Sequence, residues 1–388
     1  MSFTGILQHR DHRNQGLNYQ TSGQTPTMSD DDEQYRIFLE LWNYTYDTTD
    51  SNYVVSGPVQ LCSKKSVNEF GARFIPVFYY VNFLLSYLGN GLVLFIIYKY
   101  EKLNTVTNIF LLNLVLSNIL FASSLPFWAI YHSSEWIFGI AMCKLVSSAY
   151  FIGFYSSILF LTLMTLDRYL AVVHAVAAAK SRKKMYAIIA SLVVWCMSIV
   201  ASLKELVLQN VYENTFSGLM CEESGYPKST MERWRLVSYY QQFLLFFLLP
   251  LFMVMYCYIS ITIRILSTRM KEKCRAIKLI FVIIFTFFAC WTPYNIVILL
   301  QAIQVSMTDE KTCSDIERLD HALYVTRNIA YLYCCISPVF YTFLGKKFQS
   351  HFMRLVAKKV PCLKRHISIS SQSTRTTSQR TPHSTYEY

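Results

Sequence analysis

Charged residues are scarce in this sequence, and their scarcity excludes an ordinary soluble protein. Asp, Glu, Lys and Arg make up 15% of the 388 residues, whereas hydrophobic residues make up 53%. A soluble domain usually carries about 25% charged residues. The net charge of +12 does not indicate nucleic-acid binding, because the basic residues lie in short segments between apolar runs and in the C-terminal tail. We therefore predict a membrane protein whose basic segments face anionic lipid.

Catalytic and cofactor-binding patterns are also absent from the sequence. It contains no nucleophile–base constellation, no Gly-rich phosphate loop and no His/Cys cluster with metal-ligand spacing. We therefore expect neither an enzyme nor a bound metal or cofactor. Internal repeats and a charged pore series are lacking as well, so a transporter or channel is a remote alternative.

Long apolar runs are abundant, and they predict an all-α membrane protein. Seven runs approach or exceed the roughly 20 residues that a helix needs to cross a bilayer. They are residues 74–98, 107–130, 143–173, 185–206, 237–265, 276–303 and 321–344. The fold class expected is a seven-transmembrane helix bundle, with a short amphipathic eighth helix and disordered tails.

Basic residues follow the odd-numbered runs and set the expected topology. They are Lys99, Lys102, Lys180, Arg182, Lys183, Lys184, Arg264, Arg269, Lys271, Lys273, Arg275, Lys278, Lys346, Lys347 and Arg354. By the positive-inside rule, the N-terminus is extracellular and the C-terminus is cytoplasmic in a multi-pass plasma-membrane protein. Residues 1–61 then form a disordered extracellular tail, 62–344 the bundle, 345–360 an amphipathic membrane-surface helix, and 361–388 a cytoplasmic tail rich in Ser and Thr.

Each apolar run carries polar or helix-bending residues that a generic bundle does not need. They are Gly89-Asn90-Gly91-Leu92-Val93, Leu114 with Asn118, Asp167-Arg168-Tyr169, Trp195, Pro250 with Tyr258, Cys290-Trp291-Thr292-Pro293-Tyr294, and Ser337-Pro338-Val339-Phe340-Tyr341. Asp167 and Arg168 alone are compatible with a snorkelling pair at a helix end. In this order, however, the set resembles the rhodopsin-like G-protein-coupled receptors. The run from Tyr169 to Val176 resembles the chemokine receptors.

A closer resemblance is to the XC type of chemokine receptor, which recognises lymphotactin. Residues 99–101, 107–110, 154–157, 278–281 and 324–330 carry it. Chemokine receptors usually have a glutamate where this chain has Arg327. Because an arginine within a membrane helix is costly to desolvate, Arg327 is a candidate for a functional site. An internal ion pair with Glu205 or Asp320 is the alternative.

The resemblance implies how a chemokine is bound and how the signal is passed on. The chemokine engages the acidic tail and then inserts its N-terminus among Tyr79, Trp128, Tyr150, Tyr294 and Arg327. The residues implied in activation are Asp167, Arg168, Tyr169, Tyr258, Phe287, Trp291, Pro293, Pro338 and Tyr341. Their implied partners are an inhibitory-class G protein, receptor kinases and arrestin. The last run has no lysine that could hold retinal.

The N-terminal tail becomes acidic after Met28, where translation could start as well as at Met1. The resemblance implies sulfation of its tyrosines, which are Tyr35, Tyr44, Tyr46 and Tyr53. A solvated acidic linker is the alternative. Asn43 begins a glycosylation sequon.

Four cysteines, Cys62, Cys143, Cys221 and Cys313, lie on the extracellular side in this topology, so two disulfides are expected. The resemblance implies Cys143–Cys221 and Cys62–Cys313. Cys362 follows the amphipathic segment and is a candidate for palmitoylation.

One group of residues departs from the rhodopsin-like pattern. Receptors of this family generally hold sodium with an aspartate, a serine and an asparagine; this chain keeps Ser157 but has Asn118 and Ser337 in the other two places. We expect Asn118 and Ser337 to hydrogen-bond directly, without sodium.

A scavenging receptor that signals through arrestin only is the alternative function. The intact Asp167-Arg168-Tyr169 and the basic third cytoplasmic loop argue against it.

The C-terminal tail generates a first prediction. Half of residues 367–388 are Ser or Thr, and each phosphorylation adds about −1.5 to −2 charges that the basic groove of arrestin can bind. Truncation after Cys362 should therefore slow internalisation, measured as loss of surface receptor after agonist. Equal endocytosis of the truncated and full-length chains would instead indicate an inert, solvated tail.

Overall fold

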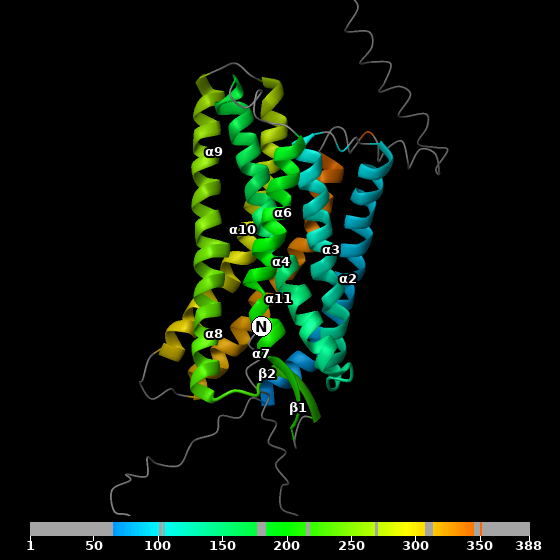
Figure 1. Ribbon diagram of the computed structural model, residues 1–388, viewed down its shortest axis with the longest axis vertical. Coiled ribbons are helices and arrows are strands. Elements are labelled where there is room, and N and C mark those ends of the chain that lie inside the picture. Colours follow the sequence, from blue (N-terminus) through cyan, green and yellow to red (C-terminus); the bar gives the residue numbers. More distant parts are fainter. Residues whose placement is uncertain are drawn as a thin grey trace, which may run out of the picture. The chain divides into compact units, whose positions relative to one another are not determined.

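The computed structural model describes residues 65–100, 105–176, 184–214, 218–267, 271–306 and 313–344, together with Leu103 and Ser350 (Figure 1). Several predictions therefore lie outside the described residues. They concern Asn43, Tyr35, Tyr44, Tyr46, Tyr53, Cys62 with its bridge to Cys313, Cys362 and both tails. The side chain of Tyr341 also lies outside them, although its backbone belongs to the last helix.

All seven apolar runs are helical, as predicted, and the helices extend beyond them. The helices are α2 (Lys65–Tyr100), α3 (Val106–Ser133), α4 (Gly139–Val173), α6 (Lys184–Ala201), α7 (Leu203–Leu208), α8 (Lys228–Phe243), α9 (Leu249–Ser267), α10 (Lys271–Ser306) and α11 (Cys313–Leu344). A π-helical turn, η1 (Leu244–Leu248), joins α8 to α9 directly before Pro250. Among the described residues, six helical segments are long and apolar enough to cross a membrane. The seventh, α11, carries several charged residues in its first half.

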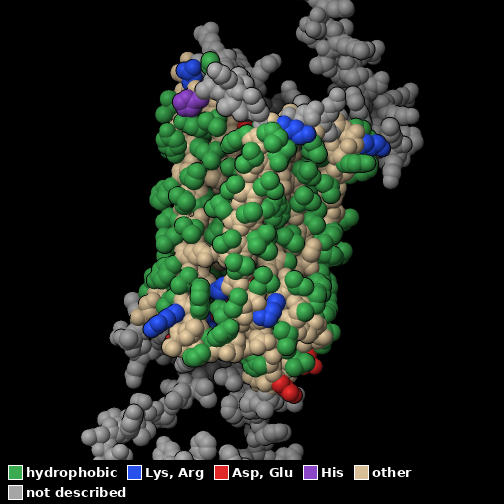
Figure 2. Space-filling view, in the orientation of Figure 1, with side chains coloured by type: hydrophobic (Ala, Val, Ile, Leu, Met, Phe, Trp, Pro, Cys, Tyr) green, Lys and Arg blue, Asp and Glu red, His purple; other side chains and the backbone are tan. Residues whose placement is uncertain are grey.

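Helix α4 lies at the centre of the bundle. It packs against α3, α6, α9 and α10, while α11 packs against both α2 and α10. In an apolar stretch of 18 residues within α4, 72% is buried. The corresponding share is 28% for the segment formed by α6 and α7. The outward faces carry large exposed apolar side chains, such as Leu88 and Phe252. Figure 2 shows these side chains covering the flank of the bundle, with most charged side chains toward its two ends, as a lipid-facing surface requires.

Small residues allow neighbouring helices to approach closely. A Cβ atom on Gly153 of α4 would lie 2.6 Å from the backbone nitrogen of Phe121 in α3. A Cβ atom on Gly89 of α2 would lie 3.0 Å from the ring of Pro338 in α11. Such contacts replace the hydrophobic effect as a source of association between helices in lipid.

A β-hairpin covers one end of the bundle, and the sequence did not predict it. Strands β1 (Gln209–Asn214) and β2 (Gly218–Glu223) pair antiparallel, with Val211 opposite Cys221. The predicted Cys143–Cys221 disulfide is present and fixes β2 to the first turns of α4. Gly218 has a φ of 70°, and a side chain there would collide with the carboxylate of Glu135. We call this the disulfide end, and the opposite end, which holds Arg168, the Arg168 end.

The contact between α3 and α4 generates a second prediction. Gly153→Ala should destabilise the receptor by about 1–3 kcal/mol, the usual cost of overpacking, because the added methyl meets backbone that cannot rotate away. The measurement is the Tm of the detergent-solubilised protein.

Gly91→Ala is the matched control. A Cβ atom on Gly91 meets nothing within 4 Å, so this change should leave the Tm unchanged or raise it slightly. Equal Tm values for the two variants would contradict the proposed close contact.

Candidate functional site

A cleft opens at the disulfide end between α4, α7, α8, α10 and α11. Its lining residues are Phe151, Lys204, Arg235, Ser238, Tyr239, Gln242, Tyr294, Ile298, Gln301, Leu323 and Arg327. Three of these described lining residues are basic and none is acidic. The cleft therefore presents positive charge and amide groups to a ligand. Tyr294 and Arg327 are the two predicted ligand-binding residues that line it.

Arg327 is buried among tyrosines. The residue is only 3% exposed. Its guanidinium carbon lies 5.0 Å from the ring centre of Tyr324, one helical turn away. Its electrostatic neighbours include Tyr79, Tyr294 and Tyr331. Aromatic faces attract a guanidinium, and this attraction offsets part of the cost of removing the charge from water.

Tyr331 contacts two other predicted ligand-binding residues, Tyr150 and Tyr79, although the sequence analysis did not select it. Its hydroxyl donates to the hydroxyl of Tyr150 over 3.0 Å, and its ring centre lies 5.5 Å from that of Tyr79. Tyr331 follows Arg327 by four residues, so the two share one face of α11. That spacing was the signal that could have identified it.

Trp128, like Tyr79 and Tyr150, is buried but does not line the cleft. Its ring packs 5.5 Å from Trp136 and 5.9 Å from Tyr131. The backbone nitrogen of Trp136 donates to the carbonyl of Leu219 in β2. Trp128 therefore supports the loop beneath the hairpin.

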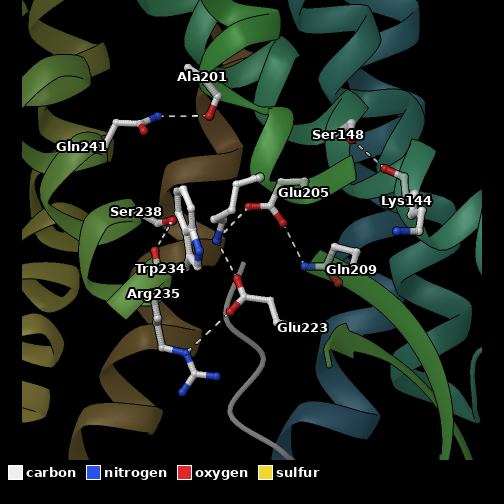
Figure 3. Close-up of polar contacts among 11 residues, drawn as sticks. Lys144, Ser148, Ala201, Glu205, Gln209, Glu223, Trp234, Arg235, Ser238 and Gln241 are labelled. Atoms are coloured by element: carbon white, nitrogen blue, oxygen red, sulfur yellow. Dashed lines mark hydrogen bonds and ion pairs between the residues drawn. The ribbon is translucent and has the colours of Figure 1, made fainter. Parts of the chain in front are cut away.

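An ion-pair network lies at the edge of the cleft (Figure 3). Lys204 contacts Glu223 at 2.6 Å and Glu205 at 3.1 Å. Gln209 donates to the second oxygen of Glu205 over 2.9 Å, and Arg235 lies 3.8 Å from Glu223. Glu205, which was considered as a partner for Arg327, thus contacts Lys204 and Gln209. The sequence analysis did not select Lys204, Glu223 or Arg235.

The hairpin has a second acidic contact on its other face. The hydroxyl of Tyr212 donates to Glu222 over 3.1 Å. Burial, followed by the charge of Glu222, raises the pKa of Tyr212 to about 12. Tyr212 therefore keeps its proton throughout the physiological range.

An aromatic path leads from the cleft into the bundle. Trp291 lies edge-on to Tyr294 at 5.9 Å and stacks on Phe154 at 4.2 Å. Phe287 follows at 6.0 Å from Trp291 and meets Tyr333 of α11 at 5.0 Å. The structure thus brings together two predicted activation residues of α10, Trp291 and Phe287, and Pro293 follows Trp291 by two residues in the same helix.

A neutral polar cluster occupies the middle of the bundle. The amide of Asn118 donates to Ser337 over 3.2 Å and to Asn90 over 3.3 Å, and all three residues are at most 1% exposed. The predicted hydrogen bond between Asn118 and Ser337 is therefore present. Ser157 donates to the carbonyl of Phe154 in its own helix. The cluster offers amide and hydroxyl groups only.

At the Arg168 end, one threonine connects Asp167 and Arg168. The hydroxyl of Thr107 in α3 donates to Asp167 over 3.2 Å and accepts from Arg168 over 2.6 Å. The sequence analysis selected Asp167 and Arg168 but not this connecting role. Of the other activation residues here, Tyr169 bonds to His174, and Tyr258 packs edge-on to Phe281.

Comparisons with known proteins now decide the family. The model for the 7 transmembrane receptor (rhodopsin family) matches residues 89–341. The C-C chemokine receptor type 3 of Cavia porcellus is 39% identical over 302 residues, which cover 78% of this chain and 83% of the relative. This chain belongs to the chemokine receptors. The C-C chemokine receptors type 4 and type 1 of Homo sapiens are 35% and 38% identical, over 79% and 83% of this chain and 84% and 90% of their own lengths.

Membership of the chemokine receptor family identifies the class of ligand and the class of partner. The chain is a multi-pass membrane receptor and not an enzyme, with a chemokine as its ligand and a G protein as its partner. The cleft at the disulfide end and the Asp167–Thr107–Arg168 contact at the other end are then the two candidate sites of this receptor.

Proposed function

We propose that this chemokine receptor is of the XC type, binds a lymphotactin-like chemokine and activates an inhibitory-class G protein for calcium signalling and chemotaxis. The observation that carries the proposal is Arg327, a cation buried in the cleft where this family usually has a glutamate. A pocket that is positive at this point favours a ligand whose inserted segment differs from that of most chemokines.

The proposed topology puts the disulfide end outside the cell. A disulfide forms in an oxidising space, and the basic segments that follow the odd-numbered runs belong to the cytoplasm. The acidic N-terminal tail then attracts the basic surface of the chemokine, and the N-terminus of the chemokine enters the cleft beside Tyr294 and Arg327.

The proposed mechanism is a shift between two states of the bundle. A ligand shifts an equilibrium only by its different affinities for the two states. Contact at Tyr294 would reach Trp291 and Phe287 through the aromatic path and favour outward movement of the half of α10 that lies toward the Arg168 end. Arg168, leaving Thr107, would then contact the G protein, while receptor kinases and arrestin act on the tail.

A panel of chemokines tests the ligand assignment. Lymphotactin should raise calcium and lower cyclic AMP in cells that express the receptor, with the cyclic-AMP response blocked by pertussis toxin. A response to C-C chemokines alone would contradict the XC assignment, and internalisation without either signal would favour the scavenging alternative.

The buried cation generates a third prediction. Arg327→Glu should abolish lymphotactin signalling, because it reverses the charge of the receptor where the inserted segment of the chemokine is proposed to bind. Surface expression and binding through the N-terminal tail should remain. Calcium release and binding of labelled chemokine are measured on the same cells.

Arg318→Glu is the matched control, since it makes the same charge change on α11 at a side chain that is 80% exposed. It should leave the potency of lymphotactin nearly unchanged. Native potency in Arg327→Glu would eliminate Arg327 as a ligand contact.

The neutral cluster generates a fourth prediction, that sodium does not regulate this receptor. Sodium favours charged oxygen ligands, and an amide oxygen cannot offset the cost of its burial as a carboxylate does. The NH₂ group of Asn118 donates to Ser337 and Asn90, so Asn118 can offer an ion only its neutral amide oxygen. Replacing sodium by N-methyl-D-glucamine at constant ionic strength should therefore leave agonist affinity unchanged.

The double change Asn118→Asp with Ser337→Asn should create the missing site. Sodium should then lower agonist affinity, because it binds the inactive state preferentially. A several-fold sodium effect on the native receptor would show that another group supplies the missing negative charge.

A further inference from the structure

Glu223 stands between two cations at the edge of the cleft (Figure 3). One of its oxygens lies 2.6 Å from Lys204 in α7, and the other lies 3.8 Å from the Nε atom of Arg235 in α8. Its side chain is only 2% exposed. Glu223 is in β2, two residues after Cys221, so the disulfide holds it in this place.

The two ion pairs of Glu223 are unequal. The contact with Lys204 is a short, charge-assisted hydrogen bond, whereas 3.8 Å is beyond hydrogen-bonding distance. The terminal nitrogens of Arg235 extend past this contact in Figure 3. The Arg235 side chain is 25% exposed and lines the cleft. A guanidinium has five N–H donors and binds carboxylates through two parallel hydrogen bonds, so Arg235 can hold a carboxylate better than it holds Glu223.

Both cations face the space that the ligand is proposed to enter. Lys204 and Arg235 line the cleft, and the described lining contains no acidic side chain. We propose that Lys204 and Arg235 form a second anion subsite, separate from Arg327, that takes a carboxylate of the ligand's inserted segment. Glu223 holds this subsite in the ligand-free receptor, and the ligand carboxylate competes with it for Arg235. The proposal rests on the proposed function, because it requires that the inserted segment enters this cleft.

The position of Glu223 gives the competition a consequence for the hairpin. Neighbouring residues of a strand point to opposite faces, and Glu222 accordingly contacts Tyr212 in β1. Displacement of Glu223 from Arg235 loosens the link between β2 and α8 but leaves the disulfide and the Tyr212 contact in place. The subsite thus determines ligand specificity and also how firmly β2 is linked to α8.

A charge scan of the ligand tests the subsite on the full-length receptor in cells. The probes are lymphotactin variants that carry one aspartate, or one lysine, at each position before the first cysteine. At one position at least, aspartate should be favoured over lysine by about tenfold or more in affinity, as expected for an ion pair sheltered from water. Arg235→Glu should reverse that preference at the same position. Arg233→Glu, a matched change at an exposed residue of the same helix, should keep it.

Changing Glu223 gives an independent measurement. Glu223→Gln removes the competing carboxylate and should raise the affinity for the favoured aspartate variant several-fold. Glu222→Gln makes the same change on the opposite face of β2 and should not raise it. Surface expression shows whether each variant is folded.

The outcomes separate this proposal from the function on which it rests. If lymphotactin does not activate the native receptor, the XC assignment fails, and the same scan is made on the chemokine of the panel that does activate it. If the chemokine activates the receptor but no position shows a preference that Arg235→Glu reverses, the subsite is wrong. Equal effects of Glu223→Gln and Glu222→Gln on this affinity would show that Glu223 does not compete with the ligand carboxylate for Arg235.

Discussion

The disulfide between Cys143 and Cys221 is the link on which the cleft depends. Cys143 belongs to α4, the helix that contacts most of the others, and Cys221 belongs to the hairpin that covers the disulfide end. Because the hairpin is joined to the central helix, Glu223 is held within contact distance of Lys204 and Arg235. Trp136 and Glu135 add backbone contacts to Leu219 from the loop before α4. One covalent bond therefore helps to place Glu223 beside two of the basic residues that line the cleft.

The bundle buries its cations in two different ways. Lys204 has two carboxylates within 3.1 Å, so its charge is balanced by ion pairs within the protein. Arg327 lies among aromatic rings, including that of Tyr324. These rings attract its guanidinium and offset part of the cost of burying it. The two proposed roles follow these surroundings: Arg327 is proposed as an anchor in the cleft, and Lys204 as part of a subsite that Glu223 holds in the ligand-free receptor.

The sequence predicted the parts of this structure that repeat or follow general rules. The seven helices follow from apolar runs of membrane length, and the pairing of Cys143 with Cys221 followed from the resemblance to a family. The contact of Asn118 with Ser337 also came from a family position. The parts that were not predicted depend on pairs that are distant in the sequence. Thr107 meets Asp167 across 60 residues, and Lys204 meets Glu223 across 19 residues and a hairpin. No periodicity within a single helix shows which residue on a neighbouring element a side chain will meet.

The hairpin shows why local patterns were insufficient. Strands QNVYEN and GLMCEE do not alternate cleanly between apolar and polar residues, because both faces of β2 are mostly buried. The signal present was Gly218. Its positive φ and its close contact with Glu135 favour glycine, because a larger residue would be strained there. A single glycine in a polar segment predicts a turn of some kind, but it does not predict which strands will pair.

The connection between the two ends of the receptor depends on packing in its middle. The π-helical turn η1 places Phe246 against Tyr155 of α4, with ring centres 3.8 Å apart, directly before Pro250 interrupts the backbone hydrogen bonding. Beyond Pro250, a small apolar cavity borders Phe287 and Ile158. Close-packed cores have discrete arrangements, so a ring beside free volume can change its position where a fully packed one cannot. In the proposed mechanism, the balance between the two states therefore depends on how well Phe287 and its aromatic neighbours pack in each.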